Sequence, residues 1–245
     1  MSSQRLVCAS SSFEDSAAWD RIWKYESHSF VSLQRERAGP KIEAAIKGGL
    51  EFASGDRVLD VGCGSGHALI EAAGRLSLHT RFVACDFSPA AVELARANFR
   101  DRGLAVEVLW ADAAWLPFRE ESFDKVLLLM TLQHVCDEAA VLREVDRVLA
   151  QHGELFVAVP CERSIISVWY KLRGGATSVP VVDRRSFSAR RLAALVGLRF
   201  RIAECHVSQA GSERWLVRAI DRALACVIPD WGRYIMLRCS KSVAR

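Results

Sequence analysis

The sequence has no apolar stretch long enough to cross a lipid bilayer. Its longest candidate, VLLLMTL at Val126–Leu132, is far shorter than the roughly 20 residues that a membrane-spanning helix needs. Residues 1–16 also lack the long apolar segment of a signal peptide. We therefore expect neither a transmembrane segment nor a secretory leader.

Paired cysteines and clustered histidines are missing as well. None of the eight cysteines forms a Cys-x-x-Cys pair, and no histidines lie at the spacing of a zinc site. Several cysteines lie within apolar runs, as small core residues do. The sequence therefore predicts no metal site, free thiols and a reducing, cytoplasmic environment.

Acidic residues are scarce in the second half of the chain. Between Cys161 and Arg222, 12 Lys and Arg residues stand against 5 Asp and Glu, whereas the whole chain has a net charge of only +4. Such a basic half suits an anionic partner, which could be a phosphorylated small molecule, a nucleic acid or a lipid surface. The simpler interpretation is a solvated, arginine-rich face.

Short apolar runs alternate with helical segments through the middle of the chain. The predicted strands are Arg57–Val61, Arg81–Cys85, Val106–Ala111, Lys125–Met130 and Glu154–Val159. The predicted helices between them are His67–Arg75, Pro89–Arg100 and Asp137–Leu149. Strands that are apolar throughout and joined by helices indicate an α/β fold, with a doubly wound parallel sheet covered on both faces.

The two ends of the chain do not follow this alternation of strands and helices. Two helical segments, 16–30 and 32–50, come first. After Pro160 we expect a long connection over 161–187. It is followed by a helix, Ser188–Val196, a strand, Phe200–Val207, an amphipathic helix within 212–228 and a last strand within 232–241, compatible with an antiparallel edge hairpin. We predict a single domain, 1–245. In it, 1–50 form a helical lid, 51–160 a cofactor-binding core and 161–245 a part that shapes the substrate site.

Glycines follow the first predicted strand in VLDVGCGSG. A parallel strand that ends in glycines before a helix lets backbone approach a ligand closely, as in sites for dinucleotides and for S-adenosylmethionine. His67 stands where the dinucleotide fingerprint G-x-G-x-x-G needs its third glycine. Asp60 would repel a pyrophosphate but attract the ammonium and sulfonium of S-adenosylmethionine. The sequence therefore favours S-adenosylmethionine over a dinucleotide.

Four ordered segments carry a family resemblance. VLDVGCGSG, FVACDFSPAAVELAR, ADAAWLPFREESFDKV and LREVDRVLAQHGEL resemble the successive motifs of class I S-adenosylmethionine-dependent methyltransferases. The nearest group is the small-molecule one that includes ubiquinone/menaquinone-biosynthesis enzymes. The resemblance covers Arg57–Pro160. It implies a Rossmann-like sheet of seven mostly parallel strands with an antiparallel last strand, helices on both faces and insertions after strands five and six. It also implies S-adenosylmethionine as cofactor and S-adenosylhomocysteine as product.

The resemblance and the charges of the residues assign the same roles around the first two strands. Gly62, Gly64 and Gly66, with Cys63 between them, would line the methionine end of the cofactor. Asp60 would hold its cationic amino-acid end. Asp86 could accept hydrogen bonds from both ribose hydroxyls, or serve as a charge partner for the helix that starts at Ser88–Pro89.

Further roles fall on the third and fourth strands. Asp112 would accept from the adenine amino group beside the Ala113 backbone N–H, and Phe87 could pack on the adenine face. The Leu129 carbonyl would receive the cofactor ammonium, although LLLMT lacks the polar residue that many relatives have there. In Leu116–Phe118, the aromatic side chain is expected to belong to the core.

His134 is the predicted catalytic residue. Methyl transfer is an in-line displacement, in which orientation alone can supply roughly 7–11 kcal/mol. A hydroxyl or carbon acceptor also needs a base, and histidine, with an ordinary pKa of about 6.5, suits that task. The alternative is a histidine that only starts a helix or packs in the core. Tyr25 and His28 are weaker candidates for closing over the acceptor.

Other methyltransferase chemistries fit less well. The Pro-Cys pair of cytosine C5-methyltransferases follows their fourth strand, whereas Cys161 follows the fifth here. No Asn/Asp-Pro-Pro-Tyr/Phe/Trp motif follows the fourth strand, which argues against the amino-methylating DNA enzymes. We therefore expect no DNA partner.

The acceptor is the least determined part of the prediction. Residues 161–187, with Trp169 and Tyr170, and 213–228, with Trp215 and Arg218, would shape its site. They suit an apolar or ring-bearing small molecule with negative charge, methylated on O, N or C. They also suit RNA or an amphipathic membrane contact, and 213–228 could simply pack on the sheet. An oxidoreductase or a non-catalytic cofactor-binding scaffold are further alternatives, and the oligomeric state stays open.

Overall fold

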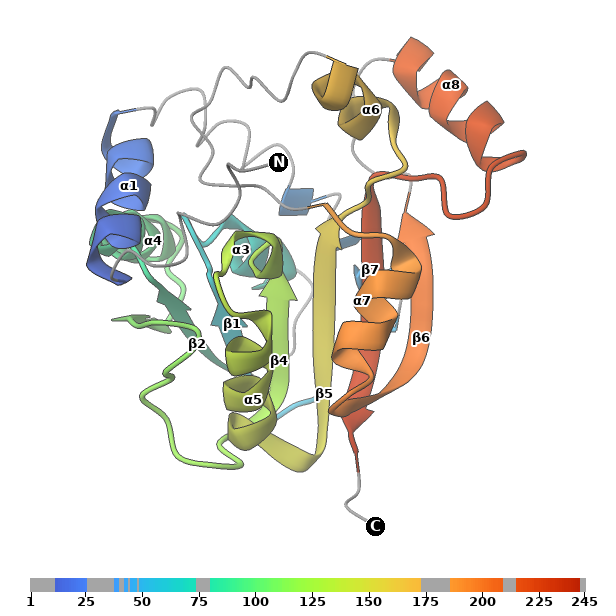
Figure 1. Cartoon of the computed structure of the whole chain (residues 1–245). Coiled ribbons are helices and arrows are strands. Elements are labelled where there is room, and N and C mark those ends of the chain that lie inside the picture. The colour runs from blue at the N-terminus through green and yellow to red at the C-terminus, as the bar shows by residue number, and fades with distance from the viewer. Residues whose placement is uncertain are drawn as a thin grey trace.

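A seven-stranded sheet forms the centre of this computed structural model (Figure 1). The structure describes residues 12–25, 38–39, 42–43, 45–47, 49–73, 80–172, 186–208 and 215–242. The strand order is β3-β2-β1-β4-β5-β7-β6. This is the doubly wound, Rossmann-like arrangement that the alternation of strands and helices predicted.

The strands keep close to their predicted positions. They are β1 Arg57–Val61, β2 Arg81–Asp86, β3 Val106–Trp110, β4 Phe123–Leu129, β5 Leu149–Pro160, β6 Phe200–Ser208 and β7 Tyr234–Lys241. The first five pair in parallel, and β7 runs antiparallel to both β5 and β6. The predicted antiparallel last strand is confirmed; it lies inside the sheet, and β6 forms the edge.

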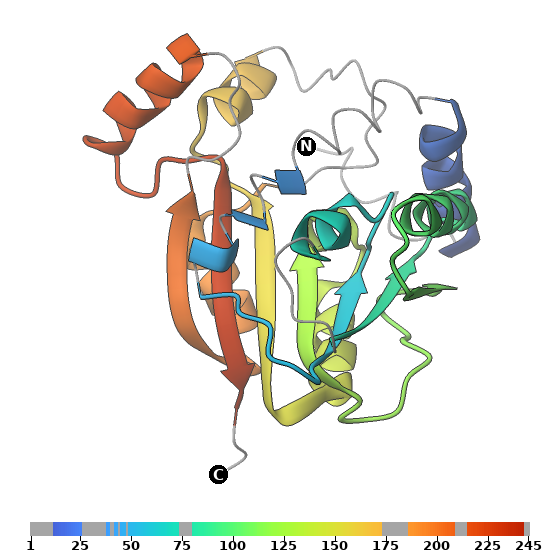
Figure 2. The same ribbon diagram turned by 180° about the vertical axis from the view of Figure 1, so that it is seen from behind.

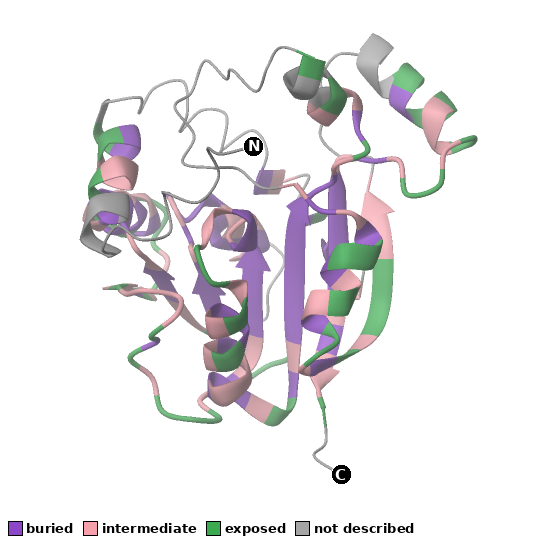
Figure 3. Cartoon of the chain, viewed as in Figure 1, coloured by how far each residue is buried: buried purple, intermediate pink, exposed green. Residues whose placement is uncertain are grey.

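Helices lie on both faces of the sheet and beyond its carboxyl edge. In chain order they are α1 Ser12–Tyr25, α3 His67–Ala73, α4 Pro89–Asp101, the short 3₁₀ helix η1 Leu132–His134, α5 Glu138–Val148, α6 Ile165–Leu172, α7 Ala189–Val196 and α8 Trp215–Ala225. α5 and α7 share one apolar core with the strands, and α3 and α4 share a second core on the opposite face (Figure 2). The central strands are accordingly buried along most of their length (Figure 3).

Local signals explain where the helices begin. Ser88 caps α4 by accepting a hydrogen bond from the Ala91 N–H at 3.3 Å, and Pro89 occupies the first turn. Asp137 caps α5 in the same way, through the Ala140 N–H at 2.9 Å. The serine–proline signal therefore marks the start of α4 as expected.

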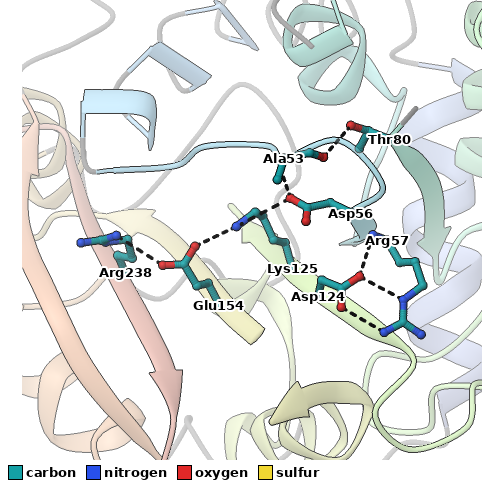
Figure 4. Close-up of polar contacts among 8 residues, drawn as sticks. All are labelled: Ala53, Asp56, Arg57, Thr80, Asp124, Lys125, Glu154 and Arg238. Carbon is teal, nitrogen blue, oxygen red and sulfur yellow. Dashed lines mark hydrogen bonds and ion pairs between the residues drawn. The ribbon is translucent and has the colours of Figure 1, made fainter. Parts of the chain in front are cut away.

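Charged residues connect the strands in the half of the sheet opposite the carboxyl ends of the parallel strands (Figure 4). The Lys125 ammonium lies 2.8 Å from Glu154 and 3.8 Å from Asp56. Glu154 also lies 3.3 Å from Arg238, which in turn contacts Glu204 at 2.7 Å. This network links the loop before β1 to β4, β5, β7 and β6.

Helices α1, α6 and α8 lie beyond the carboxyl ends of the parallel strands, where ligands bind in open α/β sheets (Figure 1). α1 lies beside α4, whereas α6 and α8 neighbour each other beyond β5 and β6 in both views (Figures 1 and 2). Any site at this edge of the sheet therefore has α1 on one side and α6 with α8 on the other.

Candidate active site

Three aspartates lie at the carboxyl ends of three neighbouring strands. Asp60 is the fourth residue of β1 and only 1% exposed, Asp86 ends β2, and Asp112 follows β3 by two residues. Because β1, β2 and β3 are parallel neighbours, these carboxyl groups share one edge of the sheet. This edge is suited to a ligand with hydroxyl or cationic groups.

The glycine-rich loop is tied to the end of β2 by its backbone. The N–H groups of Gly62 and Cys63 both donate to the Cys85 carbonyl, at 2.8 and 3.0 Å. The Gly64 N–H donates to Asp86 Oδ2 at 2.8 Å. The predicted glycine site and the predicted ribose residue are therefore brought together. Cys63 itself is buried, and burial raises the pKa of its thiol well above the ordinary value.

All three glycines adopt left-handed backbone, with φ of +75°, +54° and +77° for Gly62, Gly64 and Gly66. A side chain at any of them would also collide with another part of the chain. A Cβ would lie 2.4 Å from Thr131 Oγ1 at Gly62, 2.9 Å from the Trp23 ring at Gly64 and 2.5 Å from the Phe99 ring at Gly66. The chain's own side chains thus occupy the space next to these glycines, a reason for glycine that the sequence alone does not reveal.

The Asp86 carboxylate organises the turn between β2 and α4. Its Oδ1 accepts from the Ser88 N–H at 2.9 Å while Oδ2 accepts from Gly64. Burial raises the pKa of this carboxyl above its ordinary value, against the opposing effect of these N–H donors. Asp86 is thus a partner of the residues at the start of α4, which was the alternative to a role in ribose binding. It is also a half-buried hydrogen-bond acceptor at the end of β2.

The loop after β3 is held by α5. Asp112 Oδ1 accepts from the Ala114 N–H at 2.8 Å, which fixes the turn that contains Ala113. Glu144 accepts from the Leu116 N–H at 2.9 Å, and Arg147 donates to the Leu116 carbonyl at 2.9 Å.

The same loop ends in the core. Arg147 also donates to the Phe118 carbonyl at 2.7 Å. The Phe118 ring packs edge-on against Phe123 at 4.9 Å, so the prediction that this aromatic belongs to the core is confirmed.

Phe87 lies at the start of the turn after β2. Its carbonyl accepts from Trp110 Nε1 at 2.9 Å and from Ser16 Oγ at 3.0 Å. Trp110 is 55% exposed. The sequence placed it within the predicted strand Val106–Ala111 but assigned it no role, because its hydrogen bond to Phe87 depends on how β3 lies beside the turn after β2.

The end of β4 carries several polar groups that the sequence analysis did not single out. Leu129 ends the strand and is followed by Met130 in a left-handed conformation, φ +67°. The Thr131 hydroxyl donates to the Val61 carbonyl at 2.7 Å and so links this end to β1. Gln133 Nε2 donates to the Met130 carbonyl at 2.7 Å.

Gln133 is completely buried, and its Oε1 has no hydrogen-bond donor among the described residues. The adjacent His134 is half-buried at the end of η1, on the same edge of the sheet as the three aspartates. Gln133 holds Met130 in a strained backbone conformation, and such conformations are typical of functional sites.

Helix α1 contacts most of these elements. Asp20 Oδ1 accepts from the Ser88 hydroxyl at 2.5 Å and from the Ala90 N–H at 3.1 Å. The Trp19 ring meets the His134 ring edge-on at 4.9 Å, and Trp23 packs beside Gly64. α1 therefore touches the glycine loop, the β2–α4 turn and His134. Its terminal residue Tyr25 has no described side chain, and His28 lies outside the described residues.

The segments expected to shape the acceptor site contain α6 and α8. α8 does not pack on the sheet: Ala219 and Ala223 are exposed, Ile220 is 44% exposed, and only Asp221 is buried among its described side chains. The interpretation that this helix simply packs on the sheet is therefore wrong. The side chains of Trp169, Tyr170, Trp215 and Arg218 lie outside the described part of the structure.

The described residues contain neither a metal-ligand cluster nor a membrane-spanning helix. Within them, no three His, Cys, Asp or Glu side chains come together as a metal site. No described helix is long and apolar enough to cross a membrane.

Residues 52–179 match the family described as the methyltransferase domain. The 27-O-demethylrifamycin SV methyltransferase of Amycolatopsis mediterranei is 31% identical over 218 residues, which are 83% of this chain and 76% of that protein. A ubiquinone/menaquinone biosynthesis C-methyltransferase of Xylella fastidiosa is 29% identical over 175 residues, 69% of this chain and 60% of its own length.

Among solved structures, the fold is similar to that in the complex of the Haloferax volcanii Trm112 methyltransferase activator with a putative methyltransferase. The TM-score is 0.69 and the identity 21%, and the match covers 96% of this chain and 99% of that one.

Proposed function

Because this chain belongs to the methyltransferase domain family, we propose that it uses S-adenosylmethionine as its methyl donor and holds this donor along the carboxyl ends of β1, β2 and β3. In this proposal it methylates a hydroxyl group of a small-molecule acceptor. The observation that carries the proposal is the shared position of Asp60, Asp86 and Asp112 at one edge of the sheet, next to the glycine loop.

The residues present fit the donor chemically. S-adenosylmethionine supplies a methyl group activated by a positively charged sulfonium. Asp86 would accept from the ribose hydroxyls and Asp112 from the adenine amino group, with Phe87 against the adenine ring and the Ala113 N–H nearby. Asp60 would stabilise the positively charged amino-acid end of S-adenosylmethionine. The glycine loop, Cys63 and the Leu129 carbonyl would lie next to the same end. A set of carboxylates suits this ligand and repels a pyrophosphate.

His134 is proposed as the general base. It is half-buried at the end of η1, which follows the central strand β4, and there it would receive a proton from an acceptor hydroxyl as that oxygen becomes the nucleophile. Trp19 contacts its ring edge-on and would hold the imidazole in position. The remaining work is alignment of the acceptor oxygen with the methyl carbon.

The acceptor class follows the relatives. The relative matched over 83% of the chain is named as a methyltransferase of 27-O-demethylrifamycin SV, and another is named for ubiquinone/menaquinone biosynthesis. We propose a comparably large, ring-bearing, partly apolar acceptor. Residues 161–245 would contribute the far side of its site, through α6 and the segment around α8.

Residues 1–50 are proposed to act as a lid over the donor, with α1 as the described part. The Asp20 contacts with Ser88 and Ala90 would keep this lid closed. Asp20→Ala should speed S-adenosylhomocysteine release about three- to tenfold in stopped-flow tryptophan fluorescence, whereas Arg21→Ala, on the exposed side of α1, should not. Equal rates in both variants would contradict the lid.

We also propose a reducing, cytoplasmic setting. The seven cysteines in the described residues are free, and four of them are buried. Burial raises the pKa of Cys239 to about 12, so this thiol resists oxidation through its thiolate.

Isothermal titration calorimetry tests the donor site. S-adenosylmethionine and S-adenosylhomocysteine should both bind, and Asp86→Asn should weaken both at least tenfold. Asp101→Asn, an exposed aspartate at the end of α4, is the matched control and should bind normally. The proposal would be wrong if neither compound gave a heat of binding, or if Asp86→Asn and Asp101→Asn lost the same affinity.

Transfer of a labelled methyl group to a panel of phenols, quinols and macrocyclic alcohols tests the reaction. His134→Gln should lower kcat at least a hundredfold with little change in donor affinity. An unchanged pH dependence of kcat in His134→Gln would show that His134 is not the base.

A further inference from the structure

Gln133 carries a buried polar atom that the proposed reaction does not use. Its side chain is completely buried in the middle of η1, and its Nε2 donates to the Met130 carbonyl at 2.7 Å. Its Oε1 has no hydrogen-bond donor within the part of the chain that the structure describes. Buried amide oxygens nearly always accept a hydrogen bond, because leaving one without a donor costs free energy. This oxygen is therefore suited to a donor group on a bound molecule.

The contact with Met130 fixes which half of the Gln133 amide lies where. A carbonyl oxygen only accepts hydrogen bonds, so the NH2 half of the amide must face Met130 and the oxygen must lie on the other side. The nitrogen and oxygen of an amide are about 2.3 Å apart, so Oε1 lies within about 5 Å of the Met130 carbonyl oxygen. The oxygen is therefore at the carboxyl end of β4.

This end of β4 adjoins the proposed donor site. The Thr131 hydroxyl donates to the Val61 carbonyl at 2.7 Å, directly before the glycine loop. Asp60 is only 1% exposed and lies opposite Leu127 in the register of β1 with β4. The amide oxygen of Gln133 therefore lies at the ends of the two strands that would hold the amino-acid end of S-adenosylmethionine.

We propose that Gln133 Oε1 accepts a hydrogen bond from the ammonium group of S-adenosylmethionine. This inference rests on the donor site proposed above and adds to it a side chain that recognises the amino group. An ammonium has three N–H groups, of which Asp60 and the Leu129 carbonyl would take two. Gln133 would take the third. Every N–H of the ammonium would then have an acceptor once the group is removed from water, which lowers the cost of burying its charge.

The reacting hydroxyl of the methyl acceptor fits this oxygen less well. That hydroxyl has one hydrogen, which goes to His134 in the proposed reaction. In a 3₁₀ helix, with three residues per turn, the neighbouring side chains of Gln133 and His134 also leave the helix in different directions. The amide oxygen therefore suits a group that keeps its hydrogens throughout the reaction, as the ammonium does.

Calorimetry with two ligands tests this contact. One ligand is S-adenosylhomocysteine. The other is its deaminated analogue, which keeps the adenine, the ribose and the carboxylate and lacks only the amino group. Gln133→Met preserves the size of the side chain but removes the amide oxygen. It should bind S-adenosylhomocysteine about tenfold more weakly than the unchanged chain does, and its affinity for the analogue should change less than about twofold. Gln133→Leu should give the same pattern.

Two further variants separate the oxygen from the hold on Met130. Gln133→Glu keeps an acceptor oxygen in either protonation state, so its affinity for S-adenosylhomocysteine should return to within about threefold of the unchanged chain. Gln151→Met is the matched control. Gln151 is exposed near the start of β5, far from the carboxyl ends of the strands, and this variant should bind both ligands normally. Binding of the deaminated analogue also shows that each variant is folded.

Three results would overturn the proposal. The first is an equal loss of affinity for both ligands in Gln133→Met and Gln133→Leu, as expected if Gln133 only keeps the fold intact. The second is an unchanged affinity for S-adenosylhomocysteine in these two variants. The third is a loss in Gln133→Glu as large as that in Gln133→Met, which would limit Gln133 to holding Met130. In all three cases the unchanged chain still binds S-adenosylhomocysteine, whereas failure of the donor site itself would abolish that binding.

Discussion

At the scale of single residues, the glycine loop depends on contacts between distant parts of the chain. Gly62→Ala should lower the free energy of unfolding by about 2–4 kcal/mol, because φ is +75° and the new Cβ would lie 2.4 Å from Thr131 Oγ1. Urea denaturation measures this loss. Donor affinity should fall with it, since the Gly64 N–H leaves its place at Asp86.

Gly55→Ala separates strain from collision. Gly55 has φ +93°, but no other part of the described chain lies within 4 Å of the point where a Cβ would sit, so this variant should lose only about 1 kcal/mol. Adding Thr131→Ala to the Gly62→Ala variant should restore part of the lost stability, because it removes the atoms that the new Cβ would meet. Equal losses in the two glycine variants would show that the Thr131 contact is unimportant.

In its proposed role as acceptor for the ribose hydroxyls, Asp86 should give donor binding a pH dependence. Its carboxylate must be ionised to accept from ribose, and burial raises its pKa above 3.8, so affinity should be full at neutral pH and fall as pH drops through the raised pKa. The effect on stability has the opposite sign. The folded carboxyl keeps its proton to higher pH than the unfolded one, so this contribution to stability is present at low pH and lost as pH rises.

Calorimetry with S-adenosylhomocysteine between pH 4.5 and 8 checks the binding part. Asp86→Asn should bind weakly and with a flatter pH profile. If the variant reproduces the acid loss of the unchanged chain, another group causes it.

At the scale of elements, α5 determines where the loop after β3 lies. Arg147→Met removes hydrogen bonds to the Leu116 and Phe118 carbonyls and the partner of Glu144. We expect S-adenosylhomocysteine affinity to fall about three- to tenfold, roughly 1 kcal/mol, because Asp112 is less well positioned. Arg143→Met, exposed on the same helix, should leave calorimetric affinity unchanged; an equal effect would contradict this role.

The elements themselves were largely predictable from the sequence. β1 matches its predicted bounds because its apolar residues begin directly after Arg57 and the glycine-rich loop begins at Gly62. β5 begins at Leu149, five residues before the predicted start, because Gln151, His152 and Gly153 interrupt the apolar pattern near its beginning. α8 was predicted as a helix, but its outward orientation follows from the Asp221–Trp231 bond, which periodicity does not reveal.

At the scale of the whole molecule, the charge network of Figure 4 joins strands that are far apart in sequence. Glu154→Gln leaves Lys125, whose side chain is 13% exposed, and Arg238 without their shared partner. The free energy of unfolding should fall by about 1–3 kcal/mol in chemical denaturation.

Glu43→Gln is the control for that prediction. It breaks an exposed pair with Lys47, in which the Lys47 and Glu43 side chains are 71% and 52% exposed, and should change stability by less than about 0.5 kcal/mol. A loss as large as that of Glu154→Gln would mean that the network adds nothing beyond ordinary surface pairs.

The candidate site was predictable where it follows from strand ends. Asp60, Asp86 and Asp112 lie at or just beyond the ends of strands that the sequence marks clearly, so their common edge could be inferred. Thr131 and the contacts of Trp19 and Trp23 could not, because they depend on tertiary packing between segments about 40 to 115 residues apart.

The position of β7 between β5 and β6 has a consequence for synthesis. As the chain leaves the ribosome, β6 emerges first and has no neighbour until Tyr234–Lys241 follows. Long-range pairing of this kind forms slowly, and unpaired strands attract other chains. A premature stop before Tyr234 would therefore release two open strands at once, and the nascent protein would depend on chaperones until translation has passed this point.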